Sequence, residues 1–231
     1  MTAFPIVVFG ATSGTGTEIV RQLVAAGRPV RVAARNVAKA RALFGDTVEV
    51  VEVDLLAPGP TLDVALADAS QVLFTAGVPR QPAGEALVRA TEHDGTLAVL
   101  DAARRAGFRG RFVYLTTLGL RRRNVWMWAL DTFKWNLVAW RLRTEAAMAA
   151  SGVDVVLVRA GLLTDAPAGG TLHVIAGDEA MTLSRRISRA DVARLMIALA
   201  DAADPPRDVG VWSEAGAPAE AGAALAAVSV R

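Results

Sequence analysis

Short apolar runs alternate with segments of helical periodicity over the first two thirds of the chain. The apolar runs are rich in β-branched residues and predict buried strands at 6–9, 30–34, 48–53, 71–75, 111–116 and 153–158. Apolar residues three and four positions apart predict helices at 18–26, 37–44, 61–67, 84–106 and 124–150. This alternation predicts an α/β fold with one doubly wound, mostly parallel sheet and right-handed crossovers.

The alternation loosens after Gly161. A turn-rich stretch at 164–170 precedes a predicted edge strand at 172–176 and a helix at 188–200, and the Ala-rich tail from Ala215 carries little pattern. We find no internal repeat and no linker that divides the chain. We therefore expect a single domain over 1–231, in which a small part from about 162 to 231 covers the substrate.

The composition excludes several classes of function. Of the 231 residues, 53% are hydrophobic and 21% are charged, which is typical of a folded globular chain. The absence of cysteine excludes disulfides and cysteine nucleophiles, and with only two histidines we expect no metal centre. The formal charge of +2 does not require a nucleic-acid partner. We find no signal peptide and no apolar run long enough to span a membrane, and we expect a cytoplasmic protein.

A glycine-rich turn separates the first predicted strand from the first predicted helix. The chain there reads Phe9-Gly10-Ala11-Thr12-Ser13-Gly14-Thr15-Gly16. Glycines allow a sharp turn and a close approach of the backbone to a diphosphate, and the start of the following helix favours an anion. Because a second strand follows about 20 residues further on, the turn predicts a dinucleotide-binding site.

The ends of the next three strands predict which nucleotide is bound and how. The second strand ends in Ala34-Arg35-Asn36, without an acidic residue that could hold a ribose 2′-hydroxyl. Arg35 is therefore predicted to bind the 2′-phosphate of NADP(H). We assign Asp54 and Leu55, after the third strand, to the adenine edge, and Thr75, Ala76 and Gly77, after the fourth, to the adenosine ribose.

Further motifs occur along nearly the whole chain. They are Phe-Gly-Ala-Thr at 9–12, Gly95-Thr96, Asp101-Ala102-Ala103, Thr116-Thr117, Ser151-Gly152, Arg159-Ala160-Gly161 and Ile-Ser-Arg-Ala-Asp-Val-Ala at 187–193. With these motifs the chain resembles the atypical short-chain dehydrogenase/reductase superfamily, and within it the NmrA-like branch that includes biliverdin reductase B-type flavin reductases. The resemblance implies a single-domain Rossmann fold that binds NAD(P), with Thr116, Arg141, Ala160 and Gly161 near the cofactor.

The catalytic residues of that superfamily are not preserved. Many members carry Tyr and Lys four residues apart, where this chain has Leu137 and Arg141. Leucine cannot transfer a proton, and arginine can bind ribose hydroxyls but stays charged. In biliverdin reductase B-type proteins a Ser and a His line the site, and here Thr117 and Leu162 take those places. Thr117 and Arg141 are therefore the predicted catalytic residues.

An aromatic segment follows the fifth predicted strand. Arg121, Arg122 and Arg123 precede Trp126, Trp128, Phe133, Trp135 and Trp140. Such a pattern can bind nucleic acid or a membrane surface. Its place beside the expected nicotinamide favours pocket lining or dimer packing instead, so we expect neither of those partners. Trp126, Trp128 and Leu162 are predicted to line a pocket for a planar substrate.

The other ionisable residues are assigned mainly structural roles. His93 and His173 are isolated, and Asp191 is expected to stabilise the start of the late helix. Glu145 and Asp165 could act as an acid or a base, although Glu145 is better explained by a pairing with Arg141 or Arg159.

Three functions remain open on the sequence alone. The leading hypothesis is an NADP(H)-dependent oxidoreductase that reduces an aromatic, quinone-like or carbonyl small molecule, because hydride transfer to such acceptors needs little acid assistance. The alternatives are a non-catalytic NADP(H)-binding regulator of the NmrA type and a redox-neutral cyclase or isomerase. Either a monomer or a homodimer is compatible with the sequence.

Overall fold

The computed structural model describes residues 4–78, 84–122, 124–133 and 135–214, and its strands form one sheet. The sheet has ten strands in the order β3-β2-β1-β4-β5-β6-β10-β9-β7, with β8 paired to β10. All pairings from β3 to β10 along this order are parallel, while β10 runs antiparallel to β8 and β9. The prediction of an α/β fold with a mostly parallel sheet is confirmed. The strands are β1 (Ile6–Phe9), β2 (Val30–Ala34), β3 (Glu49–Glu52), β4 (Gln71–Phe74), β5 (Arg111–Thr117), β6 (Asp154–Ala160), β7 (Leu162–Thr164), β8 (Thr171–Ala176), β9 (Arg186–Ser188) and β10 (Asp208–Glu214).

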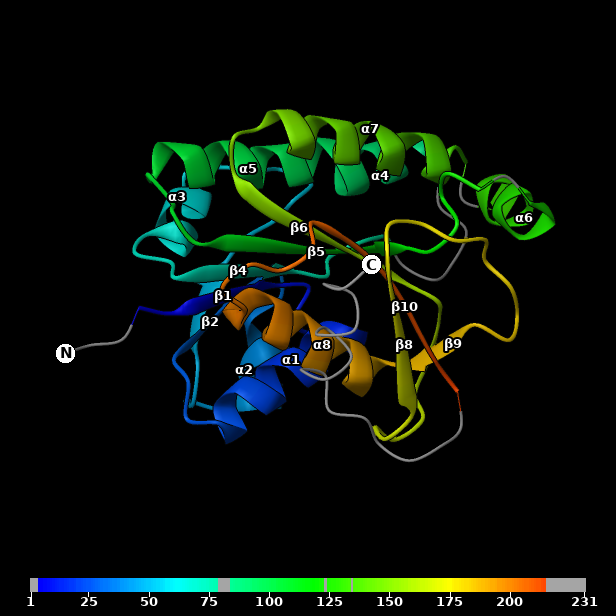
Figure 1. Ribbon diagram of the computed structural model, residues 1–231. Helices are drawn as coiled ribbons and strands as arrows, with labels where there is room; N and C mark the ends of the chain where they lie inside the picture. Colours follow the sequence, from blue (N-terminus) through cyan, green and yellow to red (C-terminus); the bar gives the residue numbers. More distant parts are fainter. Residues whose placement is uncertain (1–3, 79–83, 123, 134, 215–231) are drawn as a thin grey trace.

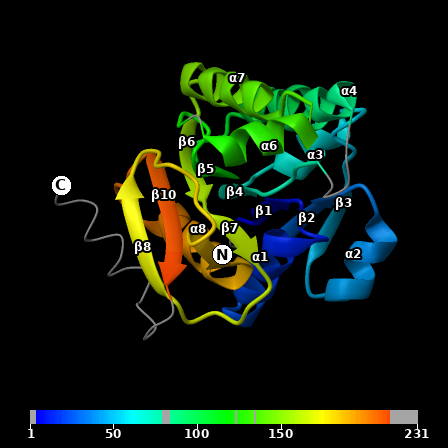
Figure 2. The same ribbon diagram turned by 90° about the vertical axis from the view of Figure 1, so that its right-hand side faces the viewer.

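Helices cover both faces of the parallel part of the sheet (Figure 1). Figure 1 shows α3, α4, α5 and α7 on one face and α1, α2 and α8 on the other, with α6 at the end of the molecule near β9. In the view of Figure 2, β8 and β10 stand to one side of the parallel strands. The helical segments are α1 (Gly14–Ala25), α2 (Val37–Phe44), α3 (Thr61–Leu66), α4 (Glu85–Arg89), the π-helical turn η1 (Ala90–Asp94), α5 (Gly95–Arg105), α6 (Val125–Phe133), α7 (Leu137–Ala150) and α8 (Arg189–Asp201).

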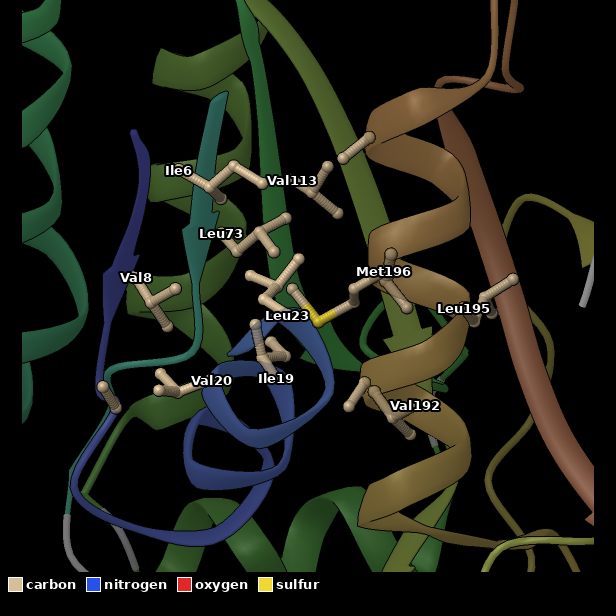
Figure 3. Close-up of a cluster of buried hydrophobic side chains, with 14 of the residues drawn as sticks. Ile6, Val8, Ile19, Val20, Leu23, Leu73, Val113, Val192, Leu195 and Met196 are labelled. Atoms are coloured by element: carbon tan, nitrogen blue, oxygen red, sulfur yellow. The ribbon is translucent and has the colours of Figure 1, made fainter. Parts of the chain in front are cut away.

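Two apolar clusters hold these layers together. In β1, Ile6 and Val8 belong to the cluster under α1 and α8, whereas Val7 and Phe9 belong to the cluster under α3 and α5. Successive side chains of a strand point to opposite faces, so a continuous apolar run is what a strand buried on both faces requires. Figure 3 shows the first cluster, in which side chains of α1 and α8 meet those of the sheet.

The structure divides two of the predicted helices differently. α1 begins at Gly14, four residues before the predicted start at 18. The predicted helix at 84–106 contains the π-helical turn η1, and the predicted helix at 124–150 is interrupted by Trp135 and Asn136, whose φ angles are +39° and +63°. Left-handed residues cannot continue a right-handed helix, so α7 begins afresh at Leu137.

Three strands lie outside the sequence prediction. β7 and β9 have only three residues each and pair with one another over Leu162 to Thr164, so neither produces a recognisable apolar period. β10 inserts between β6 and β8, and the predicted edge strand at 172–176 joins the sheet through β10. The last part of the predicted covering segment, 215–231, lies outside the described residues.

Among the described residues, no helix combines the length and the apolar character that crossing a membrane demands. In the same part of the chain, His, Asp and Glu side chains nowhere gather into a group of three or more that could hold a metal ion.

Candidate functional site

The glycine-rich turn packs against the end of β4 in a way that only glycine permits. Gly10 has a φ of +78°, and a Cβ at this position would lie 2.6 Å from the backbone nitrogen of Ala76. A Cβ on Gly16 would lie 2.3 Å from the carbonyl oxygen of Gly10. Any larger residue would force the turn away from β4. The two glycines therefore determine how closely the backbone of the turn approaches the end of β4.

The start of α1 has the properties of an anion site. Its first turn holds no acidic residue, and the Ser13 side chain does not cap it. The Thr15 hydroxyl is buried and makes no hydrogen bond within the described part of the chain. Because the first N–H groups of a helix lack internal acceptors and carry partial positive charge, they favour a phosphate. These residues fit the diphosphate of a dinucleotide.

A groove of about 730 Å³ opens beside this turn, and we call it the glycine-turn groove. It lies where β1, β4 and β5 end, which is the edge of an open α/β sheet that binds ligands. Ten residues assigned to the cofactor or catalysis from the sequence line it: Gly10, Ser13, Gly14, Thr15, Thr75, Ala76, Gly77, Thr116, Thr117 and Arg141. The fold thus brings together residues from four segments that are far apart in the sequence.

A second cavity of about 750 Å³ continues from the groove, and we call it the apolar cavity. Its walls are mainly apolar, and both volumes lie in the range of small-molecule sites. The lining includes Met127, Leu137, Ala160, Gly161, Leu162, Leu163, Met181 and Leu183. The two spaces share part of their walls, namely Val78, Thr116, Thr117, Leu163, Arg141, Asp165 and Arg189. A ligand in the groove can therefore present one end to a second molecule in the cavity.

Arg141 is held at the junction of the two spaces by a buried carboxylate. Its guanidinium bonds both oxygens of Glu92, with Nε–Oε2 at 3.0 Å and Nη2–Oε1 at 3.1 Å, and it also donates to the Thr117 hydroxyl. Glu92 is 1% exposed and accepts a third hydrogen bond from the Val78 backbone N–H at 2.9 Å. Burial alone would lower the pKa of Arg141, but the charge and hydrogen bonds of Glu92, together with the nearby Tyr114 and Glu145, outweigh it and raise that pKa. Arg141 therefore stays a cation.

The residue one helical turn before this cation is a leucine. Leu137, one turn before Arg141, is buried and lines the apolar cavity. The single tyrosine, Tyr114, lies inside β5 at 1% exposure, where burial first and then the nearby Glu92 charge raise its pKa. Tyr114 lines neither of the two spaces and is held as a neutral phenol.

A second arginine reaches the glycine-rich turn from α8. A Cβ on Gly14 would lie 3.1 Å from Nε of Arg189, so this guanidinium lies directly against the turn. Arg189 is 9% exposed and pairs with Asp165. Both residues line the groove and the apolar cavity. Asp191 stabilises the start of α8 as the sequence suggests, because it bonds the Ser188 side chain.

A third arginine cluster places none of its charged side chains in the walls of the two spaces. Arg159 is completely buried and bonds both oxygens of Glu145, at 2.9 and 2.7 Å, and both oxygens of Asp208. Arg121 adds a second cation to both carboxylates, and Thr116 donates to Glu145 at 3.1 Å. Of the two pairings proposed for Glu145, the structure forms the one with Arg159. His93, one of the two histidines that are isolated in the sequence, forms a hydrogen bond with the Thr144 hydroxyl.

The remaining predicted cofactor residues lie outside the walls of the two spaces. Arg35 follows β2 and is exposed, without an ion pair or hydrogen bond to another described residue. Asp54 follows β3 and accepts the Leu56 backbone N–H at 3.0 Å, and Leu55 packs against Gly95. Thr12 and Gly16 lie in the turn itself, behind the groove.

The predicted tryptophan lining takes a different form in the structure. Trp128 is 70% exposed on α6 and lines neither space, while its neighbour Met127 is buried and lines the apolar cavity. On α6, Met127 and not Trp128 therefore faces the interior. The side chain of Trp126 lies outside the described residues. Leu162 lines the apolar cavity.

Comparison with known proteins decides the family. The model of the NAD(P)H-binding family matches residues 10–203, which includes the turn, the groove and α8. The chain belongs to the NAD(P)H-binding family. The expected NAD(P)-binding Rossmann fold is thereby confirmed.

Relatives and solved structures extend this result. The chain is 29% identical over 219 residues to protein TIC 62, chloroplastic, from Pisum sativum, matching 84% of this chain and 40% of that protein. It therefore spans less than half of that relative's length. Among solved structures, ChuY, an anaerobillin reductase from Escherichia coli O157:H7, has a TM-score of 0.76 at 23% identity, covering 93% of this chain and 100% of that one. A short-chain dehydrogenase/reductase from Veillonella parvula in complex with NADP has a TM-score of 0.72 at 17% identity, covering 95% and 98%.

Sequence reasoning assigned no site role to Glu92 or Arg189. Glu92 precedes its partner Arg141 by 49 positions and lies in a π-helical turn, so no spacing rule connects them. Arg189 lies in the motif at 187–193 that carries part of the resemblance. The motif itself could have drawn attention to Arg189. The contact of Arg189 with Gly14, in contrast, depends on how α8 packs on α1.

Proposed function

We propose that this protein is an NADPH-dependent reductase of an aromatic, quinone-like or carbonyl small molecule. One observation carries the proposal: the glycine-turn groove and the apolar cavity share walls at Thr116, Thr117 and Arg141. A dinucleotide whose diphosphate lies at the turn would extend along the groove towards this junction, and an apolar acceptor would meet it from the cavity.

The residues at the junction bind and orient. A reduced nicotinamide, when bound, supplies the hydride, and a solvent proton completes the reduction of the acceptor. Arg141, fixed by Glu92, holds the Thr117 hydroxyl and is placed to bond ribose hydroxyls. Leu162, Leu163 and Leu183 provide an apolar wall against which the acceptor would lie. Quinone- and flavin-like acceptors suit this site because their reduction depends chiefly on orientation.

The part of the chain after 162 supplies much of the cavity wall. Leu162, Met181, Leu183 and Arg186 come from β7, β9 and the segment between β8 and β9. We propose that this part covers the substrate and determines which acceptor binds.

Turnover tests the proposal directly. Purified protein is mixed with NADPH and a panel of quinones, flavins and ketones, and absorbance at the NADPH band is followed. We expect at least one acceptor to consume NADPH in equal stoichiometry. The Thr117→Val variant is expected to retain NADPH affinity and lose turnover, since it removes only the hydroxyl. Full turnover by Thr117→Val would end the catalytic role of Thr117.

The preference for NADPH over NADH is proposed to rest on Arg35. Its exposed guanidinium at the end of β2 has no described partner and no acidic neighbour in the strand end. Its removal in Arg35→Ala should weaken NADPH binding about ten- to a hundred-fold and leave NADH binding unchanged. Equal affinity of the wild type for the two nucleotides, measured by calorimetry, would disprove this assignment.

A non-catalytic NADP(H)-binding regulator is the second candidate. Leu137 favours it, because a buried leucine in the usual tyrosine position provides no proton donor. Tight NADPH binding without consumption by any acceptor of the panel would favour the regulator over the reductase.

A further inference from the structure

The Arg189 side chain is fixed beside the glycine-rich turn by the packing of two helices. α1 and α8 lie side by side, and Gln22 of α1 donates to the Ala190 carbonyl of α8 at 2.9 Å. Arg189 is the first residue of α8, so the packing of α8 on α1 places the backbone of Arg189 next to the glycine-rich turn. Its Nε and Cδ would lie 3.1 and 3.3 Å from a Cβ on Gly14. The position of the guanidinium follows from the fold and not from a mobile surface side chain.

The carboxylate that pairs with this cation is easy to displace. Asp165 belongs to the loop between β7 and β8, and its side chain is 77% exposed, against 11% for that of Arg189. An exposed carboxylate is well hydrated whether or not it is paired. It therefore gains little free energy from the ion pair, and such a pair is weak. Two further carboxylates nearby have cations of their own: Glu18 of α1 is paired with Arg21 at 3.0 Å, and Asp191 of α8 with Arg194 at 2.8 Å.

The site around Arg189 is built for a stronger anion. The first turn of α1 has no acidic residue, and the buried Thr15 hydroxyl makes no hydrogen bond among the described residues. Arg189 and Asp165 line the same groove as Thr15, Ser13 and Gly14. A diphosphate there would meet helix N–H groups and a nearly buried guanidinium, and a guanidinium matches phosphate oxygens in a two-pronged geometry.

We infer that Arg189 is a diphosphate ligand, and that Asp165 occupies this cation until the dinucleotide displaces it. The inference rests on the proposed function, since it names a residue and a competitor within the same groove. Arg189 and Asp165 also line the apolar cavity. Release of Asp165 from the pair by the dinucleotide would therefore alter the wall that an acceptor meets.

Opposite effects of the two partners distinguish this inference from a purely structural ion pair. Calorimetry measures NADPH affinity for the wild type and the variants. Arg189→Gln should weaken NADPH binding about ten- to a hundred-fold, with partial recovery in Arg189→Lys. Asp165→Asn should strengthen NADPH binding about two- to five-fold, because a competing anion is gone. A structural pair would instead weaken binding in both variants.

The choice of ligand separates Arg189 from Arg35. Adenosine 2′-monophosphate has the 2′-phosphate and lacks the diphosphate, so Arg189→Gln should bind it as the wild type does. As a matched control, Arg105→Gln breaks an equally simple pair with Asp63 at 2.8 Å on the remote helices α5 and α3, and it should bind NADPH normally. The melting temperature of each variant verifies that it is folded.

Two results would overturn the inference. One is unchanged NADPH affinity in Arg189→Gln. The other is weaker binding in Asp165→Asn. Absence of NADPH and NADH binding by the wild type would defeat the proposed function itself, whereas wild-type binding that is indifferent to Arg189 defeats only this inference.

Discussion

Two groups of buried arginines in this fold differ in the carboxylates that neutralise them. Arg159 is enclosed by Glu145 at 2% side-chain exposure and by Asp208 at 24%, and none of these charged side chains lines the groove or the apolar cavity. Arg189 is nearly as buried, yet its partner Asp165 is 77% exposed and both line the groove. The same side chain is a structural centre in one place and a candidate ligand contact in the other.

The difference teaches that burial of an arginine does not by itself indicate its role. In the Arg159 cluster the carboxylates outweigh the burial that would lower the pKa of Arg159, and that pKa is raised. The buried parts of that cluster, Arg159 and Glu145, depend on one another, because each neutralises the other inside the protein. In the Arg189 pair the carboxylate can return to water. A ligand can then take its place without leaving a buried charge unpaired.

The largest effect is expected from Arg159. Its replacement in Arg159→Met leaves the buried Glu145 carboxylate with the half-exposed Arg121 as its remaining cation, which should lower the free energy of unfolding by about 3–5 kcal/mol. Urea unfolding measures the loss. Adding Glu145→Gln should recover part of the lost free energy, because it removes the buried charge that Arg159 had neutralised. A loss of unfolding free energy below about 1 kcal/mol, as expected for an exposed ion pair, would show that Glu145 does not depend on Arg159.

An intermediate effect is expected from Glu92. The Glu92→Gln variant removes the charge that holds Arg141 and should lower the free energy of unfolding by about 1.5–3 kcal/mol. The cost is smaller than for Arg159 because Arg141, at 16% side-chain exposure, borders the groove and keeps access to water. The same urea titration compares the two variants, and a larger loss than in Arg159→Met would reverse the order of the clusters.

The stability effect of Arg189 should be smaller still. Arg189→Gln breaks a pair with an exposed carboxylate and should lower the free energy of unfolding by less than about 1 kcal/mol, as is also expected for Arg105→Gln. The comparison between the two arginine groups therefore predicts a variant that loses ligand affinity while remaining folded. A loss of several kcal/mol in Arg189→Gln would place Arg189 in the structural class with Arg159.

His93 is expected to produce the smallest effect, through pH. Burial, which outweighs the opposing charge of Asp94, lowers the pKa of His93 below 6.5 in the folded protein. The unfolded chain then binds more protons between that lowered pKa and 6.5, so stability falls as the pH drops through this window. The His93→Gln variant should show a shallower loss of melting temperature between about pH 7 and about pH 5.5. An identical slope in both proteins would show that His93 titrates normally.

Much of the parallel sheet could be predicted from the sequence, because each strand is short, apolar on both faces and followed by a helix with its own period. The predicted strand at 6–9 coincides with β1. β7, β9 and β10 could not be predicted in this way, since β7 and β9 are too short to show a period and β10 is defined by the strands on either side of it. In the candidate site, Gly10 and Thr117 could be found because they directly follow or end predicted strands.

The sequence alone determined the alternation of strands β1 to β6 with helices and the placement of a glycine-rich turn at the first strand end, because both depend on local periodicity and on the conformational freedom of glycine. The tertiary structure alone decided that Glu92 holds Arg141, that Met127 and not Trp128 lines the cavity, and that Arg189 reaches Gly14. Each of these contacts joins segments whose separation is set by how helices pack on the sheet. Such packing depends on the summed shape of many side chains, which no local pattern contains.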